Sequence, residues 1–249
     1  MKQIIFSIAL LFFIGRDAVY AQCRSFPFFH EGTQFVFLQE TTTIPVSYGS
    51  FQNQKTLPPT ISKRRNTYRI DSVRSRGGIL SASFDLIKSE NLTPDSMRKE
   101  TSSAGIFSGI QCNGNTISYL TNIKSAGMSG MDFTMDFPLN MKVGDKLKDQ
   151  VSTIKIEKIG KNPATNITSV TRREVVANEM VLTPAGSWKC FKVSQTVTVQ
   201  IPAMNGRPAY TDNSSGISYI WFSPEMGLIK TQANFGEGAG TVATLISVR

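Results

Sequence analysis

Few residues in this sequence are of types that perform catalysis. The chain contains a single histidine, His30, and three cysteines, Cys23, Cys112 and Cys190. One imidazole cannot build a zinc triad, and a Ser-His-Asp relay or a Cys-His pair would depend on His30 alone. We therefore expect no catalytic residue, no metal site, no cofactor and no enzymatic activity. His30 is interpreted as a polar residue at the entry to the first strand.

Two carboxylates, Asp132 and Asp136, resemble at first sight the acid pair of a glycosidase. On a strand, their spacing separates the Cα atoms by about 13 Å, whereas glycosidase carboxyl groups lie about 5 to 9.5 Å apart. The pair therefore does not predict a glycosidase. The nearby methionines could bind Cu(I), but no histidine or cysteine lies beside them, and we interpret them as packing residues: Met128, Met131, Met135 and Met141.

Residues 1–21 have the layout of a secretory signal peptide. Lys2 precedes the apolar run 4–14, which is shorter than the roughly 20 residues that cross a bilayer, and Val19 and Ala21 suit cleavage before Gln22. We expect export to the periplasm or cell surface of a Gram-negative bacterium, with no transmembrane segment after cleavage. A lipid anchor at Cys23 is not expected, because Gln22 is larger than the small residue that lipidation requires before the cysteine.

Export would place the three cysteines in an oxidising compartment, where at most one intramolecular disulfide can form among them. Three pairings are possible, and sequence spacing cannot choose, because a bridge depends on Cα atoms about 5 to 6 Å apart in the folded chain. We favour Cys112 with Cys190, since both lie within predicted strands.

The mature chain is patterned for β-structure. Residues 191–201 alternate apolar and polar side chains, as expected for a strand with one buried face. Further strands are predicted at 34–38, 68–73, 79–86, 105–112, 117–122, 151–159, 167–176, 217–222, 228–235 and 242–248, separated by glycine, proline and asparagine turns. Residues 52–65 are predicted to be a long exposed loop.

These strands predict an all-β protein with little helix beyond the signal peptide. We expect one domain, residues 22–249, in which an antiparallel curled sheet hides its edges as a half-barrel, an open barrel or a sandwich. The net charge is +9, and bases such as Lys63, Arg64 and Arg65 would attract anionic partners. Lipid phosphates or acidic glycans fit an exported protein, and nucleic acid is not expected.

Two phrases in the C-terminal half are distinctive. One is Thr-Pro-Ala-Gly-Ser-Trp-Lys-Cys-Phe-Lys-Val at 183–193, and the other is Tyr-Ile-Trp-Phe-Ser-Pro-Glu-Met-Gly-Leu-Ile-Lys at 219–230. With shorter phrases at 31–33 and 139–147, they resemble the TapB-like family of exported bacterial proteins. The resemblance implies an antiparallel, curled β-sheet protein of the cell envelope without an assigned reaction.

Our leading functional prediction is an exported binding protein that holds a lipid or other amphipathic ligand in an apolar concavity, with basic residues at its rim meeting an anionic head group. The predicted lining residues are aromatic, and they could equally fill the core: Phe35, Phe37, Trp188, Phe191, Tyr219 and Trp221. The alternative is a structural component of an envelope assembly, which docks on a partner protein through an edge strand or the basic face.

Overall fold

The computed structural model describes residues 23–43, 58–93, 108–125, 128–159, 162–201, 210–211, 215–235 and 238–249. The predicted leader and residues 52–57 of the predicted loop lie outside these ranges. Within them, no helix is long and apolar enough to cross a membrane.

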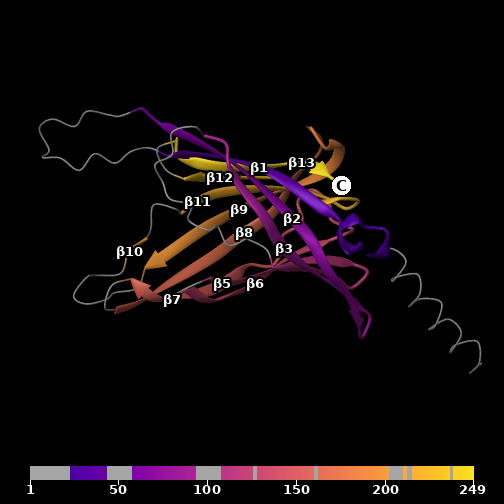
Figure 1. The fold of residues 1–249 in the computed structure, drawn as a ribbon, viewed down its shortest axis with the longest axis horizontal. Helices are drawn as coiled ribbons and strands as arrows, with labels where there is room; N and C mark the ends of the chain where they lie inside the picture. Colours follow the sequence, from indigo (N-terminus) through magenta and orange to yellow (C-terminus); the bar gives the residue numbers. More distant parts are fainter. Residues whose placement is uncertain are drawn as a thin grey trace, which may run out of the picture.

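The described chain is almost entirely antiparallel sheet (Figure 1), which confirms the all-β prediction. After a 3-10 turn, η1 (Pro27–Phe29), the strands are β1 (Gln34–Thr43), β2 (Thr60–Arg76), β3 (Ile79–Asn91), β4 (Gly109–Cys112), β5 (Thr116–Ser125), β6 (Met128–Pro138), β7 (Gln150–Ile159), β8 (Asn162–Thr183), β9 (Gly186–Ile201), β10 (Tyr210–Thr211), β11 (Gly216–Ser223), β12 (Gly227–Phe235) and β13 (Gly240–Val248).

The sheet closes on itself into a nearly complete barrel. The strand order is β10-β9-β11-β12-β13-β1-β2-β3-β4-β5-β6-β7-β8, and β8 also pairs with β9. Because β10 pairs only with the last residues of β9, the other twelve strands form the ring. The weakest junction is between β6 and β7, where Met128 and Ser129 pair with Ile156 and Lys155. Closure removes most exposed strand edges.

Two parts of the sheet differ from the sequence prediction. The prediction of a loop over residues 52–65 is wrong for residues 60–65, because β2 begins at Thr60 and pairs with β1 from that residue. Two basic residues of this part, Lys63 and Arg65, form ion pairs with Glu40 and Glu90 on the neighbouring strands. β6 is additional to the predicted strands, and its Met135 and Phe137 are buried.

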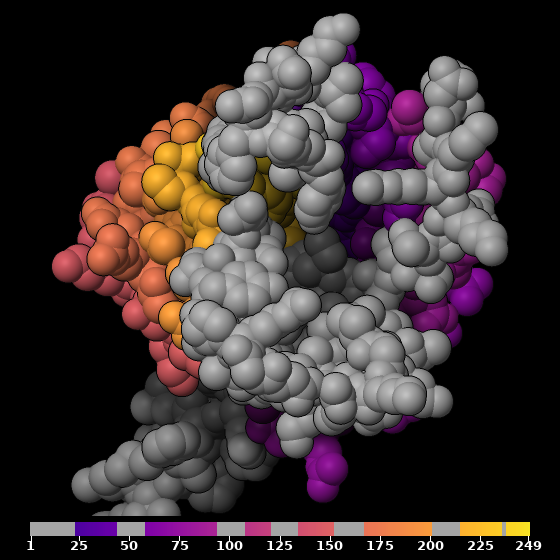
Figure 2. Space-filling model, turned by 90° about the vertical axis from the view of Figure 1, so that its left-hand side faces the viewer, coloured from indigo at the N-terminus to yellow at the C-terminus, as the bar shows by residue number. Residues whose placement is uncertain are grey.

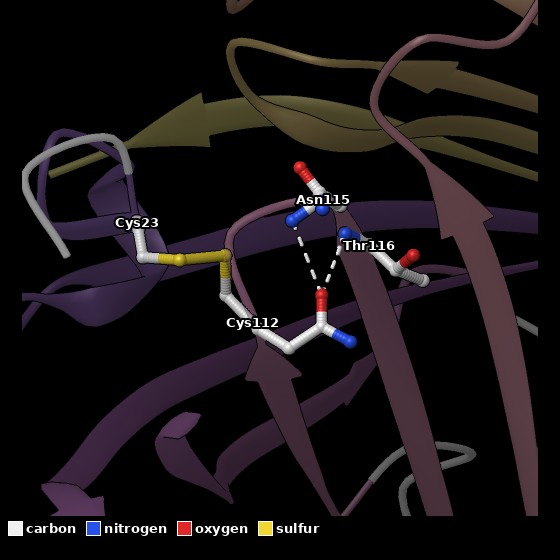
Figure 3. The surroundings of a disulfide bond; sticks show 5 residues. Cys23, Cys112, Asn115 and Thr116 are labelled. Carbon is white, nitrogen blue, oxygen red and sulfur yellow. Dashed lines mark hydrogen bonds between the residues drawn. A yellow bond between two sulfur atoms is a disulfide. The ribbon is translucent and has the colours of Figure 1, made fainter. Parts of the chain in front are cut away.

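The N-terminal segment closes one end of the barrel, at the right in Figure 1. Phe26, Phe28 and Phe29 are buried there, and the ring centroid of Phe28 lies 5.3 Å from each of the other two. A disulfide joins Cys23 to Cys112 on β4 (Figure 3). We call Cys23 to Phe29 the plug. The apolar core is continuous from the plug into the barrel.

Gly227 shows how tightly the plug meets the barrel. This residue has φ of +85° at the β11–β12 turn, a conformation that glycine adopts readily. A Cβ atom there would lie 2.6 Å from Cε1 of Phe28 and closer still to Oη of Tyr119. The absence of a side chain thus lets the turn pack directly against the plug.

Candidate ligand cavity inside the barrel

The barrel contains a cavity of about 440 Å³. Small-molecule sites commonly span about 300 to 1,000 Å³ and are mostly apolar with a few polar groups. The lining here has that character, and no charged residue is among its described members. Its apolar part includes Phe28, Phe35, Phe37, Phe84, Ile220 and Leu228, and its polar part includes Gln39, Asn66, Thr168, Gln195, Ser218 and Thr241.

Strand alternation places these side chains inside. On β1 the lining residues are Phe35, Phe37 and Gln39, at every second position. Their β2 partners are Tyr68 opposite Phe35 and Asn66 opposite Phe37, and both also line the cavity. Residues directly opposite in an antiparallel pair share a face, so the register of these strands fixes the wall.

The plug seals the apolar end of the cavity. Phe28 contributes to the lining, and its ring centroid lies 6.5 Å from that of Phe35. Nearby, the backbone N–H of Leu228 donates a buried hydrogen bond to the Tyr119 hydroxyl at 2.9 Å. Burial raises the pKa of Tyr119 far above its ordinary value, so this phenol stays neutral. This end of the cavity is therefore well packed.

The opposite end faces the viewer in Figure 2, and polar side chains line part of it. Asn66 donates to Oε1 of Gln39 at 3.2 Å and accepts from the hydroxyl of Ser89 at 2.8 Å. Farther along β1, the hydroxyls of Thr41 and Thr241 lie 3.3 Å apart. Strands β11–β13, in yellow, and β1–β2, in indigo and purple, are consecutive in the sheet, since β13 pairs with β1. We call this end the mouth.

The structure brings two of the six predicted aromatic residues to the cavity, Phe35 and Phe37. Trp188 and Phe191 pack against the core but do not line the cavity. Tyr219 and Trp221 alternate along β11 with the lining residues Ser218 and Ile220 and so lie on the other face of the sheet.

The outer face of β11 has chemistry of its own. The ammonium of Lys192 lies 4.6 Å from the ring centroid of Tyr219 and 4.9 Å from that of Trp221, and the ammonium of Lys230 lies 4.8 Å from Trp221. The indole N–H of Trp221 donates to Oε1 of Glu179 at 2.6 Å. These cation–π and hydrogen-bond contacts account for an aromatic pair outside the cavity.

The predicted Cys112–Cys190 disulfide is wrong in the structure. Cys112 pairs with Cys23, at a Cα separation of 5.9 Å, and Cys190 is a buried free thiol on β9. The plug brings Cys23 to β4, while the strand location of a cysteine says nothing about which strand it faces. The turn after Cys112 is held by the side chain of Asn113, whose Oδ1 accepts hydrogen bonds from the backbone N–H groups of Asn115 and Thr116 (Figure 3).

Sequence reasoning missed Arg173, a buried cation beside the cavity. Its guanidinium donates to Oε1 of Gln195 and to the backbone oxygens of Lys148 and Asp136 at 3.0 to 3.3 Å. Burial lowers the pKa of Arg173, and the nearby Asp136 and Asp149 partly offset this. A register shift between Thr171 and Glu174, with Arg172 at φ of +54°, turns Arg173 inward. Strict alternation of side chains could not predict this.

The other chemical candidates are placed as follows. His30 is exposed at the end of η1, just before β1. Asp136 accepts a hydrogen bond from the Ser118 hydroxyl at 2.7 Å, and the side chain of Asp132 lies outside the described set. In the described parts of the chain, no cluster of His, Cys, Asp and Glu could hold a metal ion.

Comparison with known proteins gives a family and a fold. A predicted lipoprotein from Parabacteroides distasonis has 17% identity and a TM-score of 0.56, with 90% of this chain and 98% of that chain covered. A predicted exported protein with a YmcC-like fold from Bacteroides fragilis has 18% identity and a TM-score of 0.53, with 88% and 96% covered. No curated protein matches. Neither of the two solved structures carries the TapB-like name, so that resemblance stays a prediction. The DUF3108-like family model matches residues 96–239, more than half of the sequence, and the chain belongs to that family.

Proposed function

We propose that this protein is an exported, non-catalytic binding protein that holds an amphipathic small molecule inside its barrel. The observation that supports this most is the cavity of about 440 Å³, lined by aromatic rings at the plug and by amide and hydroxyl groups mixed with apolar side chains toward the mouth. A cavity with these two ends suits a molecule with an apolar tail and a polar head. The aromatic part of the lining would remove the apolar tail of such a molecule from water, which is favourable.

The test is ligand uptake by the mature protein after delipidation. We expect native mass spectrometry to show a bound small molecule after incubation with an envelope lipid extract. Failure to take up any component of such an extract would overturn the proposal.

A matched pair of variants ties uptake to the cavity. Ala243 lines it from β13, so Ala243→Phe would fill part of the space, whereas the next residue, Thr244, lies on the other face, opposite Leu38 and Lys230. We expect Ala243→Phe to weaken binding at least about tenfold, or about 1.4 kcal/mol. Thr244→Phe should bind as the wild type does. Equal binding by both variants would place the ligand elsewhere.

The alternative, docking on an envelope protein, receives less support from the placement of the charges. Lys63, Arg65 and Arg69 are paired with Glu40, Glu90 and Asp85, so these bases do not form an unbalanced cationic face. Crosslinking in intact cells separates the two roles, because a carrier gives mainly lipid adducts and a scaffold gives one fixed protein neighbour.

A further inference from the structure

The basic run at 63–65 is divided between the two faces of β2. β2 pairs with β1 without a register break, and Arg64 lies opposite Gln39, two positions before the pair formed by Asn66 and Phe37. Gln39, Asn66 and Phe37 all line the cavity. Because opposite residues share a face and alternate residues along a strand return to it, the side chain of Arg64 leaves β2 on the cavity side.

Arg64 differs from its two neighbours in charge balance. Lys63 and Arg65 point to the outer face, where Glu40 and Glu90 pair with them. Arg64 is half-buried, and among the described residues no carboxylate lies within ion-pair distance of it. A half-buried guanidinium that no described carboxylate neutralises leaves a positive charge at the mouth that an anion could neutralise.

The wall next to Arg64 changes character step by step toward the plug. The neutral amides of Gln39 and Asn66 come next, and they are hydrogen-bonded to each other. Phe37 and Phe35 come next along β1, and Phe28 closes the end. Along β1 and β2, the cation of Arg64 at the mouth is thus followed by amide and then aromatic groups that line the cavity. An amphiphile with an anionic head would match this order if its head lay at the mouth.

We propose that the ligand is a single-chain amphiphile with an anionic head group, a carboxylate or a phosphate monoester, and that Arg64 binds this head. The inference rests on the proposed function, since it names the ligand class of the same cavity. The planar guanidinium can donate two parallel hydrogen bonds to either anion and carries a positive charge, whereas an amide is a neutral donor. Tail burial in the cavity gives affinity, and Arg64 gives selectivity for charged heads over neutral ones.

The experiment compares three probes with one tail: laurate, dodecyl phosphate and dodecanol, each displacing N-phenylnaphthylamine from the mature protein. Wild type should bind the preferred anion about tenfold more tightly than dodecanol. Arg64→Gln should lose this preference while still binding dodecanol, and its circular dichroism spectrum should match that of wild type. The matched controls Lys63→Gln and Arg65→Gln, which remove charge from the outer face, should keep the preference. The better anion identifies the head group.

Each outcome decides a different claim. If laurate and dodecyl phosphate bind no better than dodecanol, or if Arg64→Gln keeps the preference, the inference about Arg64 is overturned and the carrier role stands. If Arg65→Gln loses the preference equally, the general surface potential accounts for it and the inference also fails. If neither the fluorescent probe nor any amphiphile binds wild type, the proposed function itself fails.

A salt titration keeps the inference testable even if Arg64→Gln does not fold. Raising the salt from about 0.01 M to about 1 M shortens the Debye length from about 30 Å to about 3 Å. In wild type, this should weaken binding of the anionic probe several-fold and leave dodecanol binding unchanged. Equal responses of both probes would contradict a charge contact at the head group.

Discussion

The two ends of the barrel are built by different means. At the plug, a disulfide, buried phenylalanine rings and the Tyr119–Leu228 hydrogen bond connect segments far apart in the sequence. At the mouth, the contacts among the described residues include neutral hydrogen bonds between side chains, such as that between Gln39 and Asn66. We infer from this difference that the plug contributes more to the stability of the fold than the mouth does, and we place recognition of the proposed ligand at the mouth.

The largest effect should follow from cutting the covalent link of the plug. Cys23 and Cys112 are 89 residues apart, and a crosslink over a loop of that length restricts the unfolded chain by about 4 to 5 kcal/mol in the chain-entropy model. We expect the double variant Cys23→Ser/Cys112→Ser to lose stability of this order in urea unfolding without reductant. Cys190→Ser is the control for loss of a thiol. An unchanged urea midpoint in the double variant would show that the plug depends on packing alone.

A slightly smaller effect is expected from the packing of the plug. Phe28 is 2% exposed and contacts the rings of Phe26, Phe29 and Phe35. Truncating such a ring costs about 3 to 5 kcal/mol, so Phe28→Ala should lower the urea midpoint clearly. The control is Phe235→Ala, which truncates a partly exposed lining residue. Similar losses in both variants would contradict the proposed difference between the ends.

The Tyr119 hydroxyl allows a milder test of the plug end. Tyr119→Phe would leave the buried N–H of Leu228 without the acceptor that the hydroxyl provides, which typically costs about 1 to 3 kcal/mol. We expect a loss in this range, with the barrel retained by circular dichroism. Tyr219→Phe, on the outer face of β11, should change stability much less. If the two variants behave alike, the buried hydrogen bond does not position the β11–β12 turn.

Cys190, the cysteine that takes no part in the disulfide of the plug, gives a prediction about pH dependence. Burial and the nearby Glu179 raise the pKa of the Cys190 thiol from 9.0 to about 12. Between these values the unfolded thiol loses its proton while the folded one keeps it, so this contribution to stability is complete below pH 9.0 and declines toward about 12. Wild type should therefore lose stability relative to Cys190→Ala above pH 9.0. A constant difference across this window would contradict the burial of the thiol.

Much of the fold could be predicted from the sequence, whereas several features of the plug and the cavity could not. Period-two alternation predicted most of the strands, though not β6 or β10, because alternation depends on local backbone geometry. Phe35 and Phe37, predicted as lining residues because they are aromatic, do line the cavity. Alternation does not say which face of β11 is inside, and Tyr219 and Trp221 lie outside. The partner of Cys112 and the inward turn of Arg173 depend on long-range packing and a bulge, which leave no local pattern.

The smallest effect on stability is expected at the mouth. Thr241→Val removes the hydroxyl that lies 3.3 Å from the hydroxyl of Thr41 and keeps the shape of the side chain. The remaining Thr41 hydroxyl can turn to other partners because both residues are only partly buried, so the loss should stay below about 1 kcal/mol. The same variant makes the mouth less polar, and dodecanol displacement of N-phenylnaphthylamine should report whether the head group is sensed there. If Thr241→Val destabilised the protein as much as Tyr119→Phe, the mouth would also maintain the fold, and the contrast between the two ends would have to be given up.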